Sequence, residues 1–137
     1  MILLDTHVLV WCSLQHGAIG PKARHQISRA WSAGTLAVSA ISFLEVAQLR
    51  QHGDLLLAWS TEAWRGEWLR QGLREITLDG AVATAAAALE RVPHPGDLVD
   101  RCIVATAVAS GATLITADRG LLASAWSDGL QAIDARQ

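Results

Sequence analysis

The sequence has few of the residues and segments that mark disulfide-rich, metal–thiolate or membrane proteins. Its 137 residues include two cysteines, Cys12 and Cys102, each alone in an apolar stretch, which favours reduced thiols over a disulfide framework or a zinc site. No apolar run approaches the ~20 residues of a membrane span. The first ten residues carry an acid and no basic start, unlike a signal peptide. We therefore expect a cytoplasmic protein without a membrane segment.

Phosphate-binding glycine loops, repeats, linkers and low-complexity runs are also missing from the sequence. The absence of a Gly-rich loop argues against the common nucleotide-binding folds. A chain of this length without a linker is expected to form one domain, residues 1–137, and to bury roughly two-thirds of its unfolded surface. Its ten arginines outnumber its single lysine and favour bidentate phosphate contacts, but the net charge of −2 argues neither for nor against nucleic acid.

Short apolar segments alternate with amphipathic ones along the chain. Strands are predicted at residues 1–4, 36–39, 74–78, 112–116 and 130–133. Helices are predicted at residues 7–14, 21–33, 41–51, 55–59, 60–71, 80–90, 98–110 and 120–126. Alternating strands and helices build a parallel sheet with right-handed crossovers. We therefore expect a three-layer α/β/α fold around a central parallel sheet of about four to five strands.

The stretch 97–120, DLVDRCIVATAVASGATLITADRG, joins a helix that is apolar on most sides to a buried strand. Asp97 is expected to cap this helix, and Asp100 lies in its first turn. Asp118 follows the strand. Because open α/β sheets bind ligands at the edge where their parallel strands end, Asp100 and Asp118 are candidate site residues, whereas Asp97 is expected to be only a helix cap.

Two more carboxylates are expected at the same edge. Asp5 follows the first strand, and Glu45 lies among apolar residues in the helix at 41–51. Two carboxylates within 4 Å repel by about 4 kcal/mol at an effective dielectric constant of 20, and a helix N-terminus offsets only ~0.3–1 kcal/mol. Such a cluster must bind protons or cations, and all-oxygen ligands favour Mg²⁺ or Mn²⁺ over Zn²⁺. Metal-assisted phosphoryl chemistry is its natural use.

Each of these acids also has an ordinary structural interpretation. Asp5 with Thr6 would cap the first helix, and Glu45 with Ser42 would form a capping box. The acids of the 97–120 stretch would stabilise a helix start or a turn. The arrival of all four at one sheet edge favours a shared site.

The chain resembles a PIN domain, and within that superfamily the toxin half of VapBC-type toxin–antitoxin modules. The resemblance covers essentially the whole chain. It rests on LLDTHVLVW with Asp5, on SAISFLEVAQL with Glu45, and on DLVDRCIVATAVASGATLITADRGL with Asp100 and Asp118. The order and spacing of these motifs make the resemblance specific. Leu98 stands where many relatives have proline, which is expected to alter the start of the helix and not the ligands.

The resemblance implies a Mg²⁺- or Mn²⁺-dependent endoribonuclease that cleaves RNA with a metal-activated water and that a VapB-type antitoxin silences. The implied catalytic and metal-binding carboxylates are Asp5, Glu45, Asp100 and Asp118. The hydroxyls that would support them are those of Thr6, Ser39 and Thr116. The implied assembly is a homodimer bound to antitoxin.

Two other functions fit parts of the sequence. A phosphatase of the haloacid dehalogenase type also begins with a strand and an aspartate, but it needs a second aspartate two residues later, where this chain has His7. A catalytically silent PIN-like module that only binds protein or RNA would not need all four acids. Metal-dependent RNA cleavage by the purified protein separates that module from the enzyme. His7 and His94 are expected to have ordinary packing or turn roles.

Trp59, Trp64 and Trp68 fall within ten residues, beside Arg65 and Arg70. Core packing is the ordinary explanation for them. Tryptophan and arginine are also enriched at interface hot spots, and related toxins receive antitoxin in this part of the chain. We predict that at least one of Trp64 and Trp68 is partly exposed and contacts an antitoxin segment.

Overall fold

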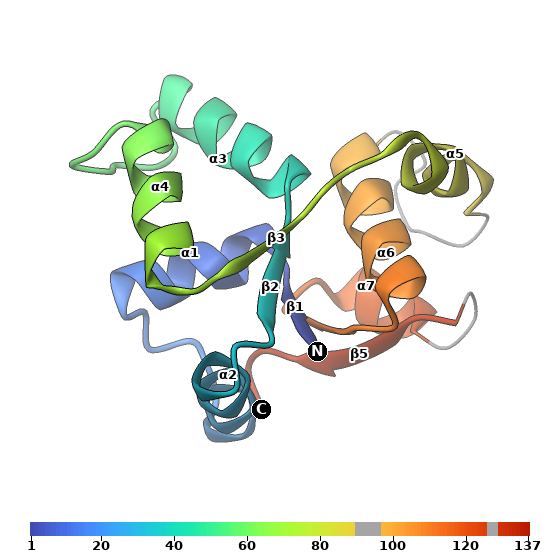
Figure 1. Ribbon diagram of the computed structural model, residues 1–137. Coiled ribbons are helices and arrows are strands. Elements are labelled where there is room, and N and C mark those ends of the chain that lie inside the picture. The colour runs from blue at the N-terminus through green and yellow to red at the C-terminus, as the bar shows by residue number, and fades with distance from the viewer. Residues whose placement is uncertain (90–96, 126–128) are drawn as a thin grey trace.

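A computed structural model describes residues 1–89, 97–125 and 129–137 of the chain. In these residues one sheet forms, with the strand order β3-β2-β1-β4-β5 (Figure 1). The strands are β1 (Ile2–Leu4), β2 (Leu36–Ser39), β3 (Arg74–Ile76), β4 (Thr113–Thr116) and β5 (Gln131–Asp134). Every neighbouring pair is parallel, so the strands all end at the same edge. The predicted parallel sheet is confirmed.

Helices cover both faces of this sheet. The described helices are α1 (Thr6–Leu14), α2 (Pro21–Ser32), α3 (Ile41–Gln51), α4 (Thr61–Gln71), α5 (Gly80–Ala88), α6 (Leu98–Ser110) and α7 (Arg119–Ser124). In Figure 1, α1 to α4 lie on one side of the sheet and α5 to α7 on the other, which is the predicted three-layer α/β/α architecture. Among the described residues, no helix is long and apolar enough to cross a membrane.

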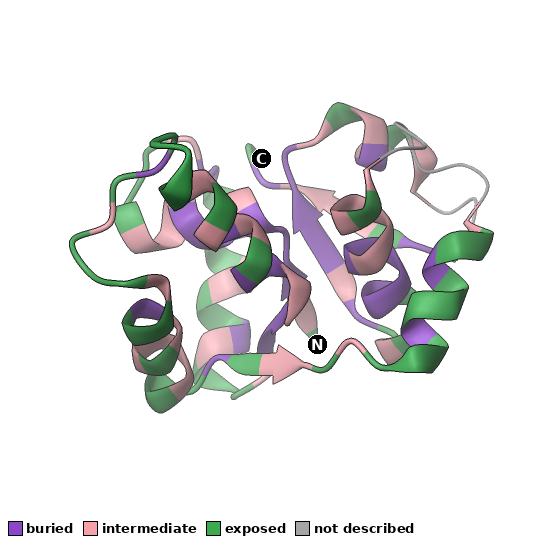
Figure 2. Ribbon diagram, turned by 90° about the horizontal axis from the view of Figure 1, so that it is seen from above, coloured by how far each residue is buried: buried purple, intermediate pink, exposed green. Residues whose placement is uncertain are grey.

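Alternate strand residues fill two separate core layers. Leu3 of β1 and Leu114 of β4 belong to a hydrophobic cluster with residues of α6 and α7. Leu4 and Ile115, their neighbours along the chain, belong to a second cluster with residues of α1 to α4. Successive side chains of a strand point to opposite faces, so the central strands β1, β2 and β4 are mostly buried because both of their faces are covered, whereas the edge strands β3 and β5 carry charged and polar residues. In Figure 2 the central strands are accordingly mostly buried, whereas the outer helix faces are exposed.

Most predicted helix limits agree with the structure, but one predicted helix is wrong. The helix α3 spans the predicted residues 41–51, and α4 begins after Ser60, whose hydroxyl caps it. No helix forms at 55–59, where Leu55 is buried and Leu56 is 87% exposed. A five-residue segment makes too few helical hydrogen bonds to offset the cost of nucleation.

The first turn of α2 is closed by residues from the other end of the chain. No side chain caps this helix, and the backbone N–H of Lys22 donates instead to the carbonyl oxygen of Gln137 at 2.6 Å. The N–H of Gly20 donates to the carbonyl of Ala135 at 2.9 Å. A Cβ atom at Gly20 would overlap the carbonyl group of Arg136, although the φ angle of −72° suits any residue. Close backbone approach therefore requires glycine here.

Replacement of this glycine is expected to destabilise the fold. Gly20→Ala should lower the free energy of unfolding by about 1–3 kcal/mol, because the added methyl group forces the two backbone segments apart. The matched control is Gly66→Ala in α4, where a Cβ atom meets nothing within 4 Å and helix propensity should add ~0.5–1 kcal/mol. Urea denaturation followed by circular dichroism measures both, and a Gly20→Ala variant as stable as the wild type would contradict the packing.

Candidate active site

The ends of β1 and β4 meet at the carboxyl edge of the sheet. The two strands pair in parallel with Leu4 opposite Ile115. Asp5 follows β1 directly, and its N–H donates to the carbonyl of Ile115 at 3.0 Å. Asp118 comes two residues after β4. Both acids therefore leave the sheet at the same edge.

Asp5 is a buried carboxylate, only 3% exposed, held on both oxygens. Its Oδ1 accepts a hydrogen bond from the backbone N–H of Thr6 at 2.7 Å, so it does cap α1. Its Oδ2 accepts from the hydroxyl of Thr116 at 2.6 Å, and that hydroxyl accepts from the N–H of Asp118 at 3.0 Å. Thr116 thus connects the two acids that follow β1 and β4.

Glu45 faces the same region from α3. The alternative capping box with Ser42 is not formed, because α3 begins after Ala40 without a side-chain cap and the Ser42 hydroxyl accepts from that of Thr6 at 3.0 Å. Burial raises the pKa of Glu45, the nearby Thr6 hydroxyl lowers it, and the charge of Asp5 raises it further. Glu45 is therefore a half-buried acid beside Asp5 that does not take part in a capping box of its own helix.

Asp100, in the first turn of α6, is a half-buried acid with a strongly raised pKa. Burial and the surrounding negative charges raise its pKa from the ordinary 3.8 to about 7. In order of decreasing effect, the charges that act on it are those of Asp97, Asp5, Glu45 and Asp118. Asp100 therefore lies within electrostatic reach of every other candidate acid, and we call these five residues the acid cluster.

Asp97 has two roles. Its Oδ1 accepts from the backbone N–H groups of Val99 and Asp100 at 3.1 and 3.2 Å, which confirms the predicted N-cap of α6. It is also the strongest charged neighbour of Asp100 and raises the pKa of Glu45. Sequence reasoning included only the cap. The available signal was the spacing of three residues, which places both aspartates on one face of the first helical turn.

Asp118 likewise combines a cap with membership of the acid cluster. Its Oδ1 accepts from the N–H of Leu121 at 2.9 Å and caps the start of α7.

As placed, no three His, Cys, Asp or Glu side chains of the described residues are close enough together to hold a metal ion. The acid cluster nevertheless presents the all-oxygen donor set that Mg²⁺ and Mn²⁺ prefer. Burial and, after it, the neighbouring negative charges raise the pKa of Asp100, and a divalent cation would favour its ionised form.

Among the supporting hydroxyls, Ser39 lies in a different network from Thr6 and Thr116. Ser39 is fully buried at the end of β2. Its Oγ accepts from the N–H of Ile41 at 3.3 Å and from the hydroxyl of Thr106 at 3.4 Å. It therefore ties the start of α3 to the middle of α6, the two helices that carry Glu45 and Asp100.

Two basic residues lie beside the acid cluster: His7, for which the sequence predicted only a packing or turn role, and Arg136, which the sequence did not single out. The ring Nδ1 of His7 lies 3.5 Å from Oδ2 of Asp5, and its Nε2 accepts from the N–H of Ala117 at 2.9 Å. Arg136 donates from Nη2 to the carbonyl of the same Ala117 at 2.6 Å. The position of His7 two residues after an acid was a weak signal, and Arg136 had none. His94, for which a packing or turn role was predicted, lies outside the described residues.

Comparison with known proteins agrees with the geometry. The model of the PIN domain family matches residues 2–126 of the chain. The chain belongs to the PIN domain family. It is 37% identical over 120 residues, 88% of each chain, to Ribonuclease VapC22 of Mycobacterium tuberculosis.

Solved structures share the fold of this PIN domain. It superposes with a TM-score of 0.69 on a chain of VapBC2 from Rickettsia felis bound to a DNA fragment from their promoter, at 18% identity and 98% coverage of both chains. A toxin–antitoxin complex from Klebsiella pneumoniae gives a TM-score of 0.57 at 24% identity, over 86% of this chain and 87% of that one. The resemblance predicted from the sequence motifs is thereby confirmed at the level of family and fold.

The raised pKa of Asp100 predicts how stability depends on pH. Between about pH 4 and pH 7 the folded protein binds more protons than the unfolded chain, so the free energy of unfolding should fall as pH rises through this window. In EDTA at pH 8, Asp100→Asn should raise the free energy of unfolding by about 1–2 kcal/mol after allowance for solvent screening. The same substitution should also make the free energy of unfolding fall less steeply as pH rises.

Asp54→Asn is the matched control, because Asp54 is exposed beyond the far end of α3. Urea denaturation at a series of pH values measures all three proteins. An Asp100→Asn variant that is less stable than the wild type at pH 8, or that keeps the full pH dependence, would contradict the electrostatic account.

Proposed function

We propose that this PIN domain is a Mg²⁺- or Mn²⁺-dependent endoribonuclease and the toxin of a type II toxin–antitoxin module. The observation that carries the proposal is the convergence of carboxylates at the carboxyl edge of the sheet, where burial together with the charges of the neighbouring acids raises the pKa of Asp100 to about 7. The relative that shares 37% of its residues is named a ribonuclease. RNA is the substrate class that follows from both.

The acid cluster would hold the metal through Asp5, Asp100 and Asp118, with Glu45 completing the quartet. A divalent ion bound there would lower the pKa of an attacking water and neutralise charge at the scissile phosphate. The chain itself contributes orientation: Thr116 and Thr6 hold the two oxygens of Asp5. No side-chain nucleophile is needed.

Removal of single charges from the acid cluster should abolish cleavage without unfolding the protein. The variants Asp5→Asn, Glu45→Gln, Asp100→Asn and Asp118→Asn should each lower the rate of RNA cleavage by at least about a hundredfold, because each removes a ligand and not only a supporting contact. Cleavage of a fluorogenic RNA with saturating Mg²⁺ or Mn²⁺ measures the rate, and circular dichroism checks the fold. Asp54→Asn serves as the control and should cleave like the wild type.

The same assay decides between the enzyme and a catalytically silent PIN-like interaction module. Near-native cleavage by any two of the four variants would refute the assignment of the metal site. Binding of RNA by the wild type without cleavage in either ion would support the silent module instead.

A tryptophan-lined groove is the proposed docking place for an antitoxin of the VapB type. Two adjoining cavities of about 400 and 480 Å³ share the side chains of Cys12, Trp68 and Gln71. The tryptophans that line one or both are Trp11, Trp31, Trp59, Trp64 and Trp68. We call the two cavities together the Trp groove. Large aromatic side chains in a cavity can pack against an apolar segment of a partner, and such residues are enriched among those that dominate binding energy.

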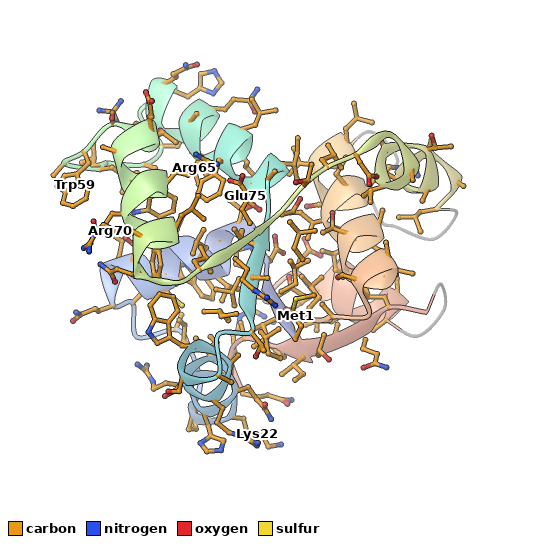
Figure 3. The ribbon with its side chains drawn as sticks, in the orientation of Figure 1. Met1, Lys22, Trp59, Arg65, Arg70 and Glu75 are labelled. Atoms are coloured by element: carbon orange, nitrogen blue, oxygen red, sulfur yellow. The ribbon has the colours of Figure 1, made fainter. Side chains whose placement is uncertain are left out.

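The three clustered tryptophans differ in exposure. Trp64 is only 6% exposed and its Nε1 donates to Ser13 at 2.9 Å, so the core interpretation holds for it. Trp68 is half-buried, as predicted for one of the pair, and packs edge to face against Trp31 and Trp64. Trp59 is 50% exposed and stands at the outer edge of the molecule near α4 (Figure 3). Trp68 and Trp59 therefore present the aromatic surface of the groove.

Loss of this surface should release the enzyme from inhibition. Trp68→Ala should weaken antitoxin binding by about 2 kcal/mol, roughly 30-fold, while leaving the cleavage rate of the free enzyme unchanged. Trp59→Ala is the second variant, since its exposed side chain can be removed with little effect on the fold. Leu44→Ala, an exposed apolar residue on α3, is the control.

Inhibition of RNA cleavage by titrated antitoxin measures the effect. Wild-type inhibition of both tryptophan variants would place the antitoxin contact elsewhere. The homodimer implied by the family resemblance stays a prediction.

A further inference from the structure

Both polar groups of the Ala117 backbone are held by side chains from other parts of the fold. Its N–H donates to Nε2 of His7 in α1 at 2.9 Å, and its carbonyl accepts from Nη2 of Arg136, after β5, at 2.6 Å. Ala117 itself is buried and lies between Thr116 and Asp118. The short connection from β4 to α7 is therefore held by two side chains. One is that of His7, next to Asp5, and the other is that of Arg136, which follows the neighbouring strand β5.

The bond from Ala117 determines which nitrogen of His7 carries a proton. A nitrogen that accepts a hydrogen bond must be unprotonated, so the neutral ring has its proton on Nδ1. That nitrogen lies 3.5 Å from Oδ2 of Asp5, the oxygen that also receives the Thr116 hydroxyl. The distance is long for a hydrogen bond, but it places the Nδ1 proton next to a buried carboxylate.

The ring of His7 is held in this position from its other side. It packs edge to face against Trp11, one helical turn later in α1, with ring centroids 5.1 Å apart. Oδ1 of Asp5 is occupied by the N–H of Thr6, so His7 and Thr116 together define the direction of Oδ2. Packing alone would not require a polar atom beside either nitrogen, yet Nε2 accepts from the N–H of Ala117 and Nδ1 lies 3.5 Å from Asp5.

We propose that His7 is a positioning residue that orients Asp5 for cation binding through its Nδ1–H. The proposal rests on the proposed function, because the cation is the reason for orienting Asp5. Outer groups that hydrogen-bond to metal ligands typically contribute 10–100-fold to metal affinity or activity. His7 joins Asp5 to the backbone next to Asp118, so it couples the acid after β1 to the acid after β4.

Two isosteric variants separate the contacts of the ring. His7→Gln keeps an acceptor near the position of Nε2 for Ala117 and removes the donor that faces Asp5. His7→Asn does the reverse, since its amide lies near the position of Nδ1. Arg136→Met, which releases the same Ala117 peptide without touching Asp5, is the comparator. Each full-length variant is titrated with Mn²⁺, with free Mn²⁺ measured by electron paramagnetic resonance, and its unfolding midpoint is measured in EDTA.

His7→Gln should bind Mn²⁺ at least about tenfold more weakly than the wild type, and its kcat at sub-saturating Mn²⁺ should fall while the KM for RNA is unchanged. His7→Asn should bind closer to the wild type than His7→Gln does. Arg136→Met should bind equally well or more tightly, since it removes a positive charge near the acid cluster.

Three outcomes would overturn the proposal. Wild-type Mn²⁺ affinity in His7→Gln would exclude a role in orienting Asp5. Equal weakening by Arg136→Met would show that His7 only holds the Ala117 peptide. A wild-type protein that neither binds Mn²⁺ nor cleaves RNA would refute the proposed function together with this inference, whereas the first two outcomes leave the proposed function intact.

Discussion

Repulsion among carboxylates at one edge of the sheet is the constraint on which the site depends. Burial and the charges of four neighbouring acids together raise the pKa of Asp100 to about 7. The guanidinium of Arg101, the next residue, does not neutralise Asp100, because it donates to the carbonyls of Ala86 and Leu89. His7 beside Asp5 counters the negative charges only in part, so the site favours the binding of protons or of a cation.

Local structure and the acid cluster use the same side chains without conflict. Asp5, Asp97 and Asp118 each cap a helix through one carboxylate oxygen. A cap occupies a single oxygen and benefits from the positive end of the helix. The cap therefore fixes the orientation of the acid and stabilises its charge. The structural and functional interpretations of these residues are both correct, which is why neither could exclude the other from sequence alone.

The helix α1 connects the two surfaces that the proposals assign. His7, near its start, contacts Asp5 and the backbone before Asp118. Trp11, one turn later, contacts the ring of His7 and lines the Trp groove, where it also stacks on His16. A partner in the groove and a cation at the acid cluster would therefore contact the same short helix from its two ends.

The sequence by itself determined the strand and helix order, the parallel sheet and the arrival of four acids at one edge, because apolar periodicity and caps are local properties of the chain. It could not exclude the false helix at 55–59, whose composition is helical but whose side chains lack a face to bury. Only the tertiary structure decided that His7 and Arg136 hold the backbone of Ala117 from either side. Those contacts join residues 110 and 19 positions apart, and such pairings arise only when the sheet places its strand ends side by side.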